Sequence, residues 1–260
     1  MGDSRIIGVV SGKGGVGKTT ISVNLALGLK ELGKEVTVVD TDFDASNLGV
    51  HLGQYEHPIK VHDVLHQHAE PEDAIFRHST GIKAMVSSNE INKVEPDTDL
   101  LRYTLERAAS ESDYVIVDCP PGIDSTVEDI IEACDELLVV TLPTRTSATN
   151  AAQIIEKAKR MHKPVLGTVV NMTEDDPERE MIDREVEMMT ESDIVSRIPQ
   201  DKKMKESLFH NTPLLKHEPL SKAAIEIRDL AHAMEGQNFE RPKFATFKRK
   251  ISSFKEAISK

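Results

Sequence analysis

Cysteine is scarce in this sequence: Cys119 and Cys134 are the only two among 260 residues, and no C-x-x-C pair occurs. Iron–sulfur clusters and metal clips need closely spaced cysteines, so this scarcity argues against a metal or electron-transfer carrier. Two isolated cysteines are instead typical of a protein kept reduced in the cytoplasm.

Long apolar runs are also lacking, and none reaches the length that spans a bilayer. The first five residues lead directly into an apolar segment, so no signal peptide is expected. An apolar content of 38% with 29% charged residues is ordinary for a soluble globular protein, and 260 residues can form one large α/β core.

Basic residues are in the minority overall but gather at one end. The chain carries a net charge of −12, whereas residues 241–260 hold seven basic residues against Glu256, a balance of +6 that leaves −18 for the rest. An acidic body repels the DNA backbone, and a short basic tail attracts anionic surfaces. DNA is therefore not expected as a partner of the body.

The most informative segment is residues 12–19, GKGGVGKT, which fits the phosphate-loop pattern G-x-x-x-x-G-K-[ST]. Residues 6–10 before it form an apolar run typical of a buried strand, and residues 20–32 after it show helical periodicity. Glycines let backbone N–H groups close on phosphate oxygens, and the helix N-terminus adds a favourable dipole. The expected nucleotide contacts are Gly12, Gly14, Gly15, Val16, Gly17, Lys18, Thr19 and Thr20.

Two later segments extend this pattern. Residues 38–44 read VVDTDFD and are followed by NLG at 47–49, and residues 115–122 read VIVDCPPG. Together with Lys13, the extra lysine after the first glycine, they resemble the deviant phosphate loop, switch I and Walker B–switch II segments of the MinD/ParA family of P-loop ATPases. The resemblance covers roughly residues 5–235 and is strongest to the MinD branch, including archaeal-type MinD proteins.

Strands and helices alternate along the chain, which predicts an α/β, three-layer fold: a mainly parallel twisted sheet with helices on both faces. The expected strands are 5–11, 35–40, 82–87, 114–118, 136–142, 165–171 and 194–198. The expected helices are 18–32, 99–110, 126–133, 148–161, 179–189, 202–208 and 221–234. Ligands of such sheets bind at the carboxyl ends of the strands, where the phosphate loop, Asp40, Asp118 and Asn171 are expected to meet.

The site residues suggest individual roles. Lys18 is expected to neutralise the β- and γ-phosphates, and Thr19 to be a direct Mg²⁺ ligand. Asp118, at a strand end, suits a carboxylate that holds the metal through water. Asp40 and Asp42 share a face of an extended segment because they are two residues apart. The resemblance assigns Asp40 mainly to the metal or to positioning the catalytic lysine, and Asp42 to orienting the attacking water.

The resemblance also implies a dimer. In this family the lysine equivalent to Lys13 reaches the partner's nucleotide, where its charge stabilises the transferring phosphoryl group, so hydrolysis requires an ATP-dependent homodimer. Gly122 is expected to offer its N–H to the γ-phosphate and so couple the nucleotide to switch II. The role of Asp44 is open.

Recognition of the base is less specific. Asn171 ends an expected strand and could hydrogen-bond adenine, and Pro199, Gln200 and Asp201 could line the other side of the base. Met172 stands where the family often has an arginine, so the residues alone leave GTP open beside ATP.

Six of the ten histidines lie between His51 and His78. His62, His66 and His68 could meet near one helical face and bind a metal, but no acid or cysteine completes the set. The alternative is a short surface helix at residues 61–65.

The end of the chain has a different pattern. Residues 1–235 form the expected ATPase domain, 236–242 a linker, and 243–260 a basic amphipathic helix. Its apolar residues recur at spacings of 3, 4, 3 and 4 with lysines on both edges of the stripe, a pattern that favours insertion into an anionic lipid boundary. Docking of the same stripe on the body or on a partner protein is the alternative. The stripe consists of Phe244, Phe247, Ile251, Phe254 and Ile258.

Three function classes remain. The first is an ATP-switched, Mg²⁺-dependent ATPase of the cytoplasm that associates peripherally with the membrane and positions cell-division or other machinery, with an activating or cargo protein as partner. The second is a ParA-type partitioning ATPase, against which the acidic body counts. The third is a metal or electron-transfer carrier, against which the missing cysteine pair counts. The resemblance and the tail together favour the first.

Overall fold

The computed structural model describes residues 4–54, 57–88, 97–174, 176 and 178–242. Its centre is one eight-stranded sheet in the order β3-β4-β2-β5-β1-β6-β7-β8. Neighbouring strands are parallel except for β3 and β4, which are antiparallel. The strands are β1 (Arg5–Ser11), β2 (Val36–Asp40), β3 (Phe76–Arg77), β4 (Lys83–Met85), β5 (Tyr114–Pro121), β6 (Glu136–Thr141), β7 (Val165–Thr173) and β8 (Ile194–Pro199).

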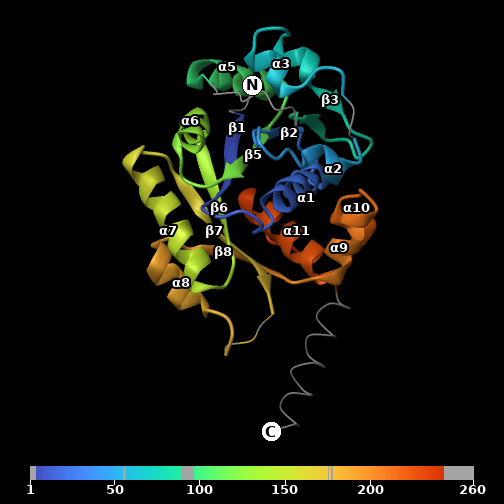
Figure 1. Cartoon of the computed structure of the whole chain (residues 1–260). Helices are drawn as coiled ribbons and strands as arrows, with labels where there is room; N and C mark the ends of the chain where they lie inside the picture. Colours follow the sequence, from blue (N-terminus) through green and yellow to red (C-terminus); the bar gives the residue numbers. More distant parts are fainter. Residues whose placement is uncertain (1–3, 55–56, 89–96, 175, 177, 243–260) are drawn as a thin grey trace.

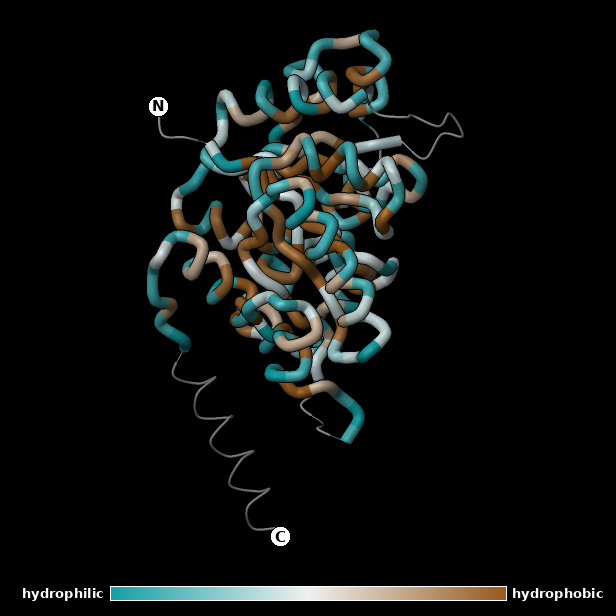
Figure 2. Tube along the Cα trace, turned by 90° about the vertical axis from the view of Figure 1, so that its left-hand side faces the viewer, coloured by the Kyte–Doolittle hydropathy of each residue, from teal (hydrophilic) through white to brown (hydrophobic). Residues whose placement is uncertain are grey.

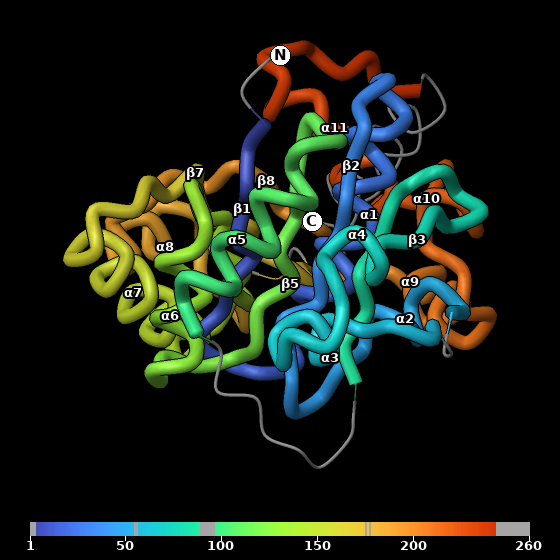
Figure 3. The backbone as a smooth tube through the Cα atoms, turned by 90° about the horizontal axis from the view of Figure 1, so that it is seen from above, coloured from blue at the N-terminus to red at the C-terminus, as the bar shows by residue number. Residues whose placement is uncertain are grey.

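Helices cover both faces of this sheet and make three layers, as expected (Figure 1). One face carries α1 (Lys18–Glu31), α2 (Leu48–Leu52), α9 (Lys202–Phe209), α10 (Leu214–His217) and α11 (Lys222–Met234). The other face carries α3 (Val61–Leu65), α4 (Pro71–Ala74), α5 (Thr98–Ala109), α6 (Ser125–Ala133), α7 (Arg145–Arg160) and α8 (Asp183–Thr190). Viewed from above, α6, α7 and α8 lie on the left of the molecule and α9 and α10 on the right (Figure 3).

Strand β1 shows why the sheet is buried on both faces. Its side chains alternate, so that Ile7 and Val9 pack in the core under α1, while Ile6 and Val10 pack in the core under α5, α6 and α7. A parallel strand covered on both faces reads as a continuous apolar run rather than as an alternating one. The tube in Figure 2 accordingly shows hydrophobic segments in the interior and hydrophilic ones outside.

Most expected elements are confirmed within a few residues, and the differences have local causes. The expected helix at 179–189 begins only at Asp183, because Met181 is buried against Ala148 and Val186 and its N–H donates to Pro143 O. The two-residue strand β3 and the short helices α2, α4 and α10 were not predicted, because four or five residues give too little periodicity.

Residues 236–242 turn back along α11. Helix α11 begins beside Asp201, whose Oδ2 accepts from Ala223 N, and ends where Arg5 binds Met234 O, at the opposite end of the sheet. Gly236 then adopts a left-handed φ of 64°, and Arg241 forms a bidentate ion pair with Glu226 and a further one with Asp229. This return segment therefore brings the chain back toward the first half of α11. The expected helix at 243–260 lies outside the described residues.

Within the described ranges, no helix is both long and apolar enough to cross a membrane.

Candidate nucleotide site

Two carboxylates stand side by side at the carboxyl end of the sheet. Asp40 ends β2 and is the direct partner of Asp118 on β5. Because side chains alternate along strands, Asp40 shares the face of Val38, and Asp118 that of Ile116; both apolar residues pack in the α1 core. Both acids therefore point toward α1, and their exposed fractions are 0% and 1%.

The loop between β1 and α1 forms a cradle of backbone groups. Gly15 and Gly17 have φ values of 77° and 93°, a region in which other residues are strained. A Cβ on Gly17 would come within 2.4 Å of Asn171 Nδ2, and one on Gly12 within 2.5 Å of Asn150 O. These close approaches fix where the glycines must be, whereas Gly15 meets no atom within 4 Å and leaves the concave side open. Such a loop fits a row of phosphate oxygens.

Helix α1 supplies polar groups to the same place. Lys18 is buried. Burial raises the pKa of Asp118 to about 6, although hydrogen bonds with Thr19 and Ser22 and the charge of Lys18 oppose the rise. Ser22 Oγ lies 3.0 Å from both Asp118 Oδ1 and Lys18 O, and its one proton is available to either acceptor. The phosphate loop, its lysine and the strand-end carboxylate are thus directly connected.

Asp40 is held by donors from the segment that follows it. Asp42 N donates to its Oδ1 at 3.0 Å, and Ser46 Oγ and Leu48 N donate to its Oδ2 at 2.6 and 3.2 Å. Burial, together with the neighbouring charge of Asp118, nevertheless raises the pKa of Asp40 to about 7. Burial likewise raises the pKa of Asp118. Two buried carboxylates are costly and the single charge of Lys18 cannot balance both, so the pair favours a further bound positive ion.

These residues fit a Mg²⁺-bound nucleotide. Magnesium is commonly held by one or two carboxylates, a hydroxyl, waters and substrate phosphates rather than by a closed set of protein ligands. Asp40, Asp118 and Thr19 offer this incomplete set. Among the described residues no group of three or more His, Cys, Asp and Glu side chains could hold a metal by itself.

Comparisons with known proteins agree with this geometry. A family model of the ParA group, described as an NUBPL iron-transfer P-loop NTPase, matches residues 3–235. An uncharacterized ATP-binding protein of Methanocaldococcus jannaschii is 32% identical over 232 residues, which are 89% of this chain and 88% of that protein. The chain belongs to the MinD/ParA family of P-loop NTPases.

Solved structures place it near the MinD branch of that family. The septum site-determining protein MinD of Pyrococcus horikoshii, complexed with Mg-ADP, superposes with a TM-score of 0.83 at 28% identity, covering 89% of this chain and 96% of that one. MinD in the MinC:MinD cell division complex of Aquifex aeolicus gives a TM-score of 0.83 at 25% identity, covering 91% and 98%. The predicted family, branch and fold are therefore confirmed.

Three further residues are expected to act at this site: Lys13 in the phosphate loop, Asp42 after β2 and Gly122 after β5. Lys13 is exposed, with its carbonyl bound to Ser11 Oγ, and Asp42 is half-buried and accepts from Ala45 N. Gly122 has a φ of 119°, and its N–H donates to Ser11 O at 3.0 Å. Donation from Gly122 to a γ-phosphate would require this bond to open. The roles of these three residues stay predictions.

The residues expected at the base already have partners in the protein. Asn171 Nδ2 donates to Val16 O at 2.7 Å, which ties the end of β7 to the phosphate loop. Asp201 caps α9 through Lys203 N and also accepts from Ala223 N, while Pro199 and Gln200 pass from β8 into that helix. Base recognition stays a prediction.

The proposed histidine cluster does not assemble. His62 is buried and its Nδ1 lies 3.0 Å from Ser87 Oγ, so α3 is not simply a surface helix. His66 and His68 stack on each other outside, with ring centroids 5.8 Å apart. Because His62 is buried while His66 and His68 are exposed, the three side chains do not converge on one ion.

The structure also brings to the site residues that the sequence did not point to. Ser22 orients Asp118, Ser46 orients Asp40, and Asn150 packs against Gly12. Ser22 follows Lys18 by one helical turn, a signal that could have been read; Ser46 and Asn150 carry no such signal.

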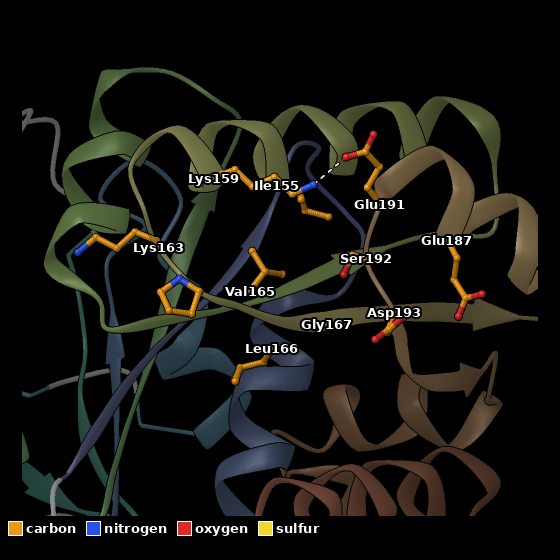
Figure 4. A pocket seen from close by; sticks show the side chains of 11 residues that line it. Ile155, Lys159, Lys163, Val165, Leu166, Gly167, Glu187, Glu191, Ser192 and Asp193 are labelled. Atoms are coloured by element: carbon orange, nitrogen blue, oxygen red, sulfur yellow. Dashed lines mark hydrogen bonds and ion pairs between the residues drawn. The ribbon is translucent and has the colours of Figure 1, made fainter.

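A cavity of about 510 Å³ lies elsewhere, at the amino end of β7 (Figure 4). Its lining includes Leu166, Gly167 and the ion pair of Lys159 with Glu191, whose charged atoms are 2.8 Å apart. It lies at the end of the sheet opposite the phosphate loop, so size alone does not locate the nucleotide site.

Proposed function

We propose that this protein is a MinD-type switch ATPase that hydrolyses Mg-ATP to ADP and phosphate. The observation that supports this most directly is the pair Asp40 and Asp118, buried side by side against Lys18 on α1. A protein gains nothing in stability from two buried like charges, so their retention beside a phosphate loop indicates a cation in the working state.

The chain's own residues divide the work. The loop N–H groups and Lys18 bind the phosphates, and Thr19, Asp40 and Asp118 hold the magnesium ion. Asp42 orients the attacking water from the rim of the site. When bound, the ion neutralises charge that develops on the phosphate oxygens during transfer.

Turnover in this proposal requires a homodimer. Lys13 is exposed, so its side chain is available to a facing subunit. A charge supplied in trans raises the rate only when two chains meet, which makes hydrolysis a consequence of dimerisation.

The proposal extends to the membrane and to partner proteins. The basic amphipathic segment at residues 243–260 associates with anionic lipid when an ATP-bound dimer presents two copies of it, and hydrolysis releases the segment. An activating or cargo protein binds the dimer, as the MinC:MinD complex of Aquifex aeolicus suggests for this branch. The resulting localisation is cytoplasmic with peripheral membrane association, and the machinery positioned is that of cell division or a comparable process.

The test of the ATPase is phosphate release with and without Mg²⁺. Asp118→Asn should lose turnover, because a neutral amide no longer balances the metal. Asp135→Asn is the matched control: Asp135 follows α6 at the other end of the sheet and bonds Ile6 N and Arg102. Equal rates for wild type and Asp118→Asn would refute the assignment.

The membrane part is tested by co-sedimentation with anionic vesicles and, separately, with DNA. Lipid binding should need ATP and fall with salt, and Ile251→Glu should abolish it while leaving nucleotide binding intact. Sedimentation with DNA instead of vesicles would favour the ParA-type function.

A further inference from the structure

His51 joins the two halves of the nucleotide site. It lies on α2, in the segment that follows Asp40. Its Nε2 is 3.1 Å from Thr20 Oγ1 on α1, and its Nδ1 is 2.9 Å from Asn47 O at the start of α2. Thr20 is buried, with 8% of its surface exposed.

The partners determine which atom holds each proton. A carbonyl oxygen can only accept, so His51 Nδ1 must carry a hydrogen and donate it to Asn47 O. Burial lowers the pKa of His51, which favours the neutral ring. A neutral ring with hydrogen on Nδ1 has a bare Nε2, which can only accept. The Thr20 hydroxyl is therefore the donor.

The Thr20 hydroxyl has one proton to donate, and two acceptors can lie within its reach: His51 Nε2 and a nucleotide phosphate oxygen. It stands in the first turn of α1, directly after Lys18 and Thr19, where a nucleotide phosphate is expected. Its backbone cannot follow the ligand, because its carbonyl accepts from Asn24 Nδ2 at 2.8 Å within the helix. Only the hydroxyl can turn. A phosphate oxygen, which is an acceptor, and His51 Nε2 therefore compete for the same proton.

We propose that His51 is a positioning residue that couples occupancy of the phosphate site to switch I. When the Thr20 proton turns to a phosphate oxygen, His51 loses its donor and the link between α1 and α2 opens. The coupling rests on the proposed nucleotide binding and adds to it a route by which α2 senses the ligand.

Helix α2 is suited to transmit this change. It has five residues, and its first N–H, that of Leu48, donates to Asp40 Oδ2 at 3.2 Å. Gly53 ends it with a φ of 66°. One end of α2 thus touches the metal-site carboxylate, and the middle touches the phosphate-loop helix. A shift at His51 reaches Asp40 within a single helical turn.

The experiment is a double-mutant cycle read by calorimetric Mg-ADP binding to the full chain. His51→Leu removes the competing acceptor and should tighten Mg-ADP binding by about three- to tenfold, the range expected for one hydrogen bond. In a Thr20→Val background the same substitution should change Kd less than about twofold, because no hydroxyl remains to be shared.

His51→Gln serves as the conservative variant, because its amide oxygen can replace Nε2 as acceptor and should restore a Kd near that of wild type. Hydrogen exchange of residues 47–52 supplies a second readout: Mg-ADP should speed it in wild type, and His51→Leu should speed it without nucleotide. If wild type binds Mg-ADP but His51→Leu binds no tighter, or gains as much in the Thr20→Val background, the coupling is wrong. If wild type binds no Mg-ADP, the proposed function fails and the coupling fails with it.

Discussion

The two ends of the central sheet are built from opposite electrostatics. At the amino end, charged side chains meet partners of opposite sign near the surface: Arg5 binds Glu136 at 2.7 Å, and Lys34 binds Glu235 at 2.6 Å. At the carboxyl end, Asp40 and Asp118 are buried together with like charge.

This difference between the two ends indicates which charged residues contribute to stability and which are there for chemistry. Ion pairs at the surface contribute little to stability and can be lost without much consequence. A buried like-charged pair reduces stability unless something else balances it, so it is kept for chemistry. The same strands thus end in an inert edge on one side and a reactive one on the other.

Lys18→Ala should show the greatest effect. Removing the charge that faces the phosphates should weaken Mg-ATP binding by more than about a hundredfold, beyond detection in a standard calorimetric titration. Lys30→Ala is the matched control, because Lys30 lies on the same helix but pairs with Glu35 at the amino end. Unchanged affinity of the Lys18→Ala variant would remove the phosphate-loop assignment and the contrast between the two ends.

Lys13→Ala should reduce hydrolysis by about a hundred- to a thousandfold while much of the monomer's ATP affinity remains, because the lost charge acts across the dimer. Phosphate release measures the first quantity, and size exclusion with ATP should show fewer dimers. A variant that hydrolyses at the wild-type rate would show that no charge is supplied in trans.

Asp42→Ala should slow turnover and leave an ATP-bound dimer, because the water is no longer oriented while the phosphate contacts persist. Size exclusion in ATP and Mg²⁺ should therefore show more dimer than wild type. The same monomer fraction and the same turnover would exclude Asp42 from this role.

Asp40→Asn should stabilise the metal-free protein above neutral pH by about 1–3 kcal/mol while abolishing turnover. Folded Asp40 keeps its proton up to a pKa of about 7, whereas an unfolded aspartate releases it near pH 4. At Asp40 the folded state therefore binds more protons between these values, so the contribution of Asp40 to the free energy of unfolding should fall as pH rises from about 4 to about 7.

Urea unfolding of wild type and Asp40→Asn at pH 5 and pH 8 measures this difference. Asp113→Asn, at the amino end, is the control and should bring no gain. A gain of Asp40→Asn over wild type that is no larger at pH 8 than at pH 5 would show that the pair at the carboxyl end carries no such cost.

Lys34→Ala should have the least effect, a loss below about 1 kcal/mol, because Lys34 is partly exposed and Glu235 keeps the hydrogen bond from the Tyr114 hydroxyl. Thermal unfolding checks this. A loss several times greater would mean that the amino end is not the inert edge described above.

The phosphate loop and the strand ends could be predicted because their signals are local. A glycine pattern between an apolar run and a helix specifies a cradle, and an aspartate directly after valines marks where a buried strand leaves the core. The parallel order then brings Asp40 and Asp118 together, although 77 residues separate them.

The remaining contacts depend on the folded arrangement. Nothing near Ser46 in the sequence says that its hydroxyl will reach back to Asp40, and nothing near His51 points to Thr20. The late start of α8 has a similar cause: the burial of Met181 outweighs the helical pattern of the residues around it. Such choices depend on neighbours distant in the sequence.

The return segment at residues 236–242 determines where on the molecule the rest of the chain is attached. Because Arg241 holds the chain against Glu226, whatever follows residue 242 has its root beside the first half of α11, toward the end of the sheet that holds the phosphate loop. A short tether confines its free end to a small volume and so raises its local concentration there. Breaking the Arg241 ion pairs would release residues 236–242 from α11 and move the point of attachment to the other end of the molecule. The chain beyond residue 242 could then reach farther, but its attachment point would no longer lie near the end of the sheet that holds the phosphate loop.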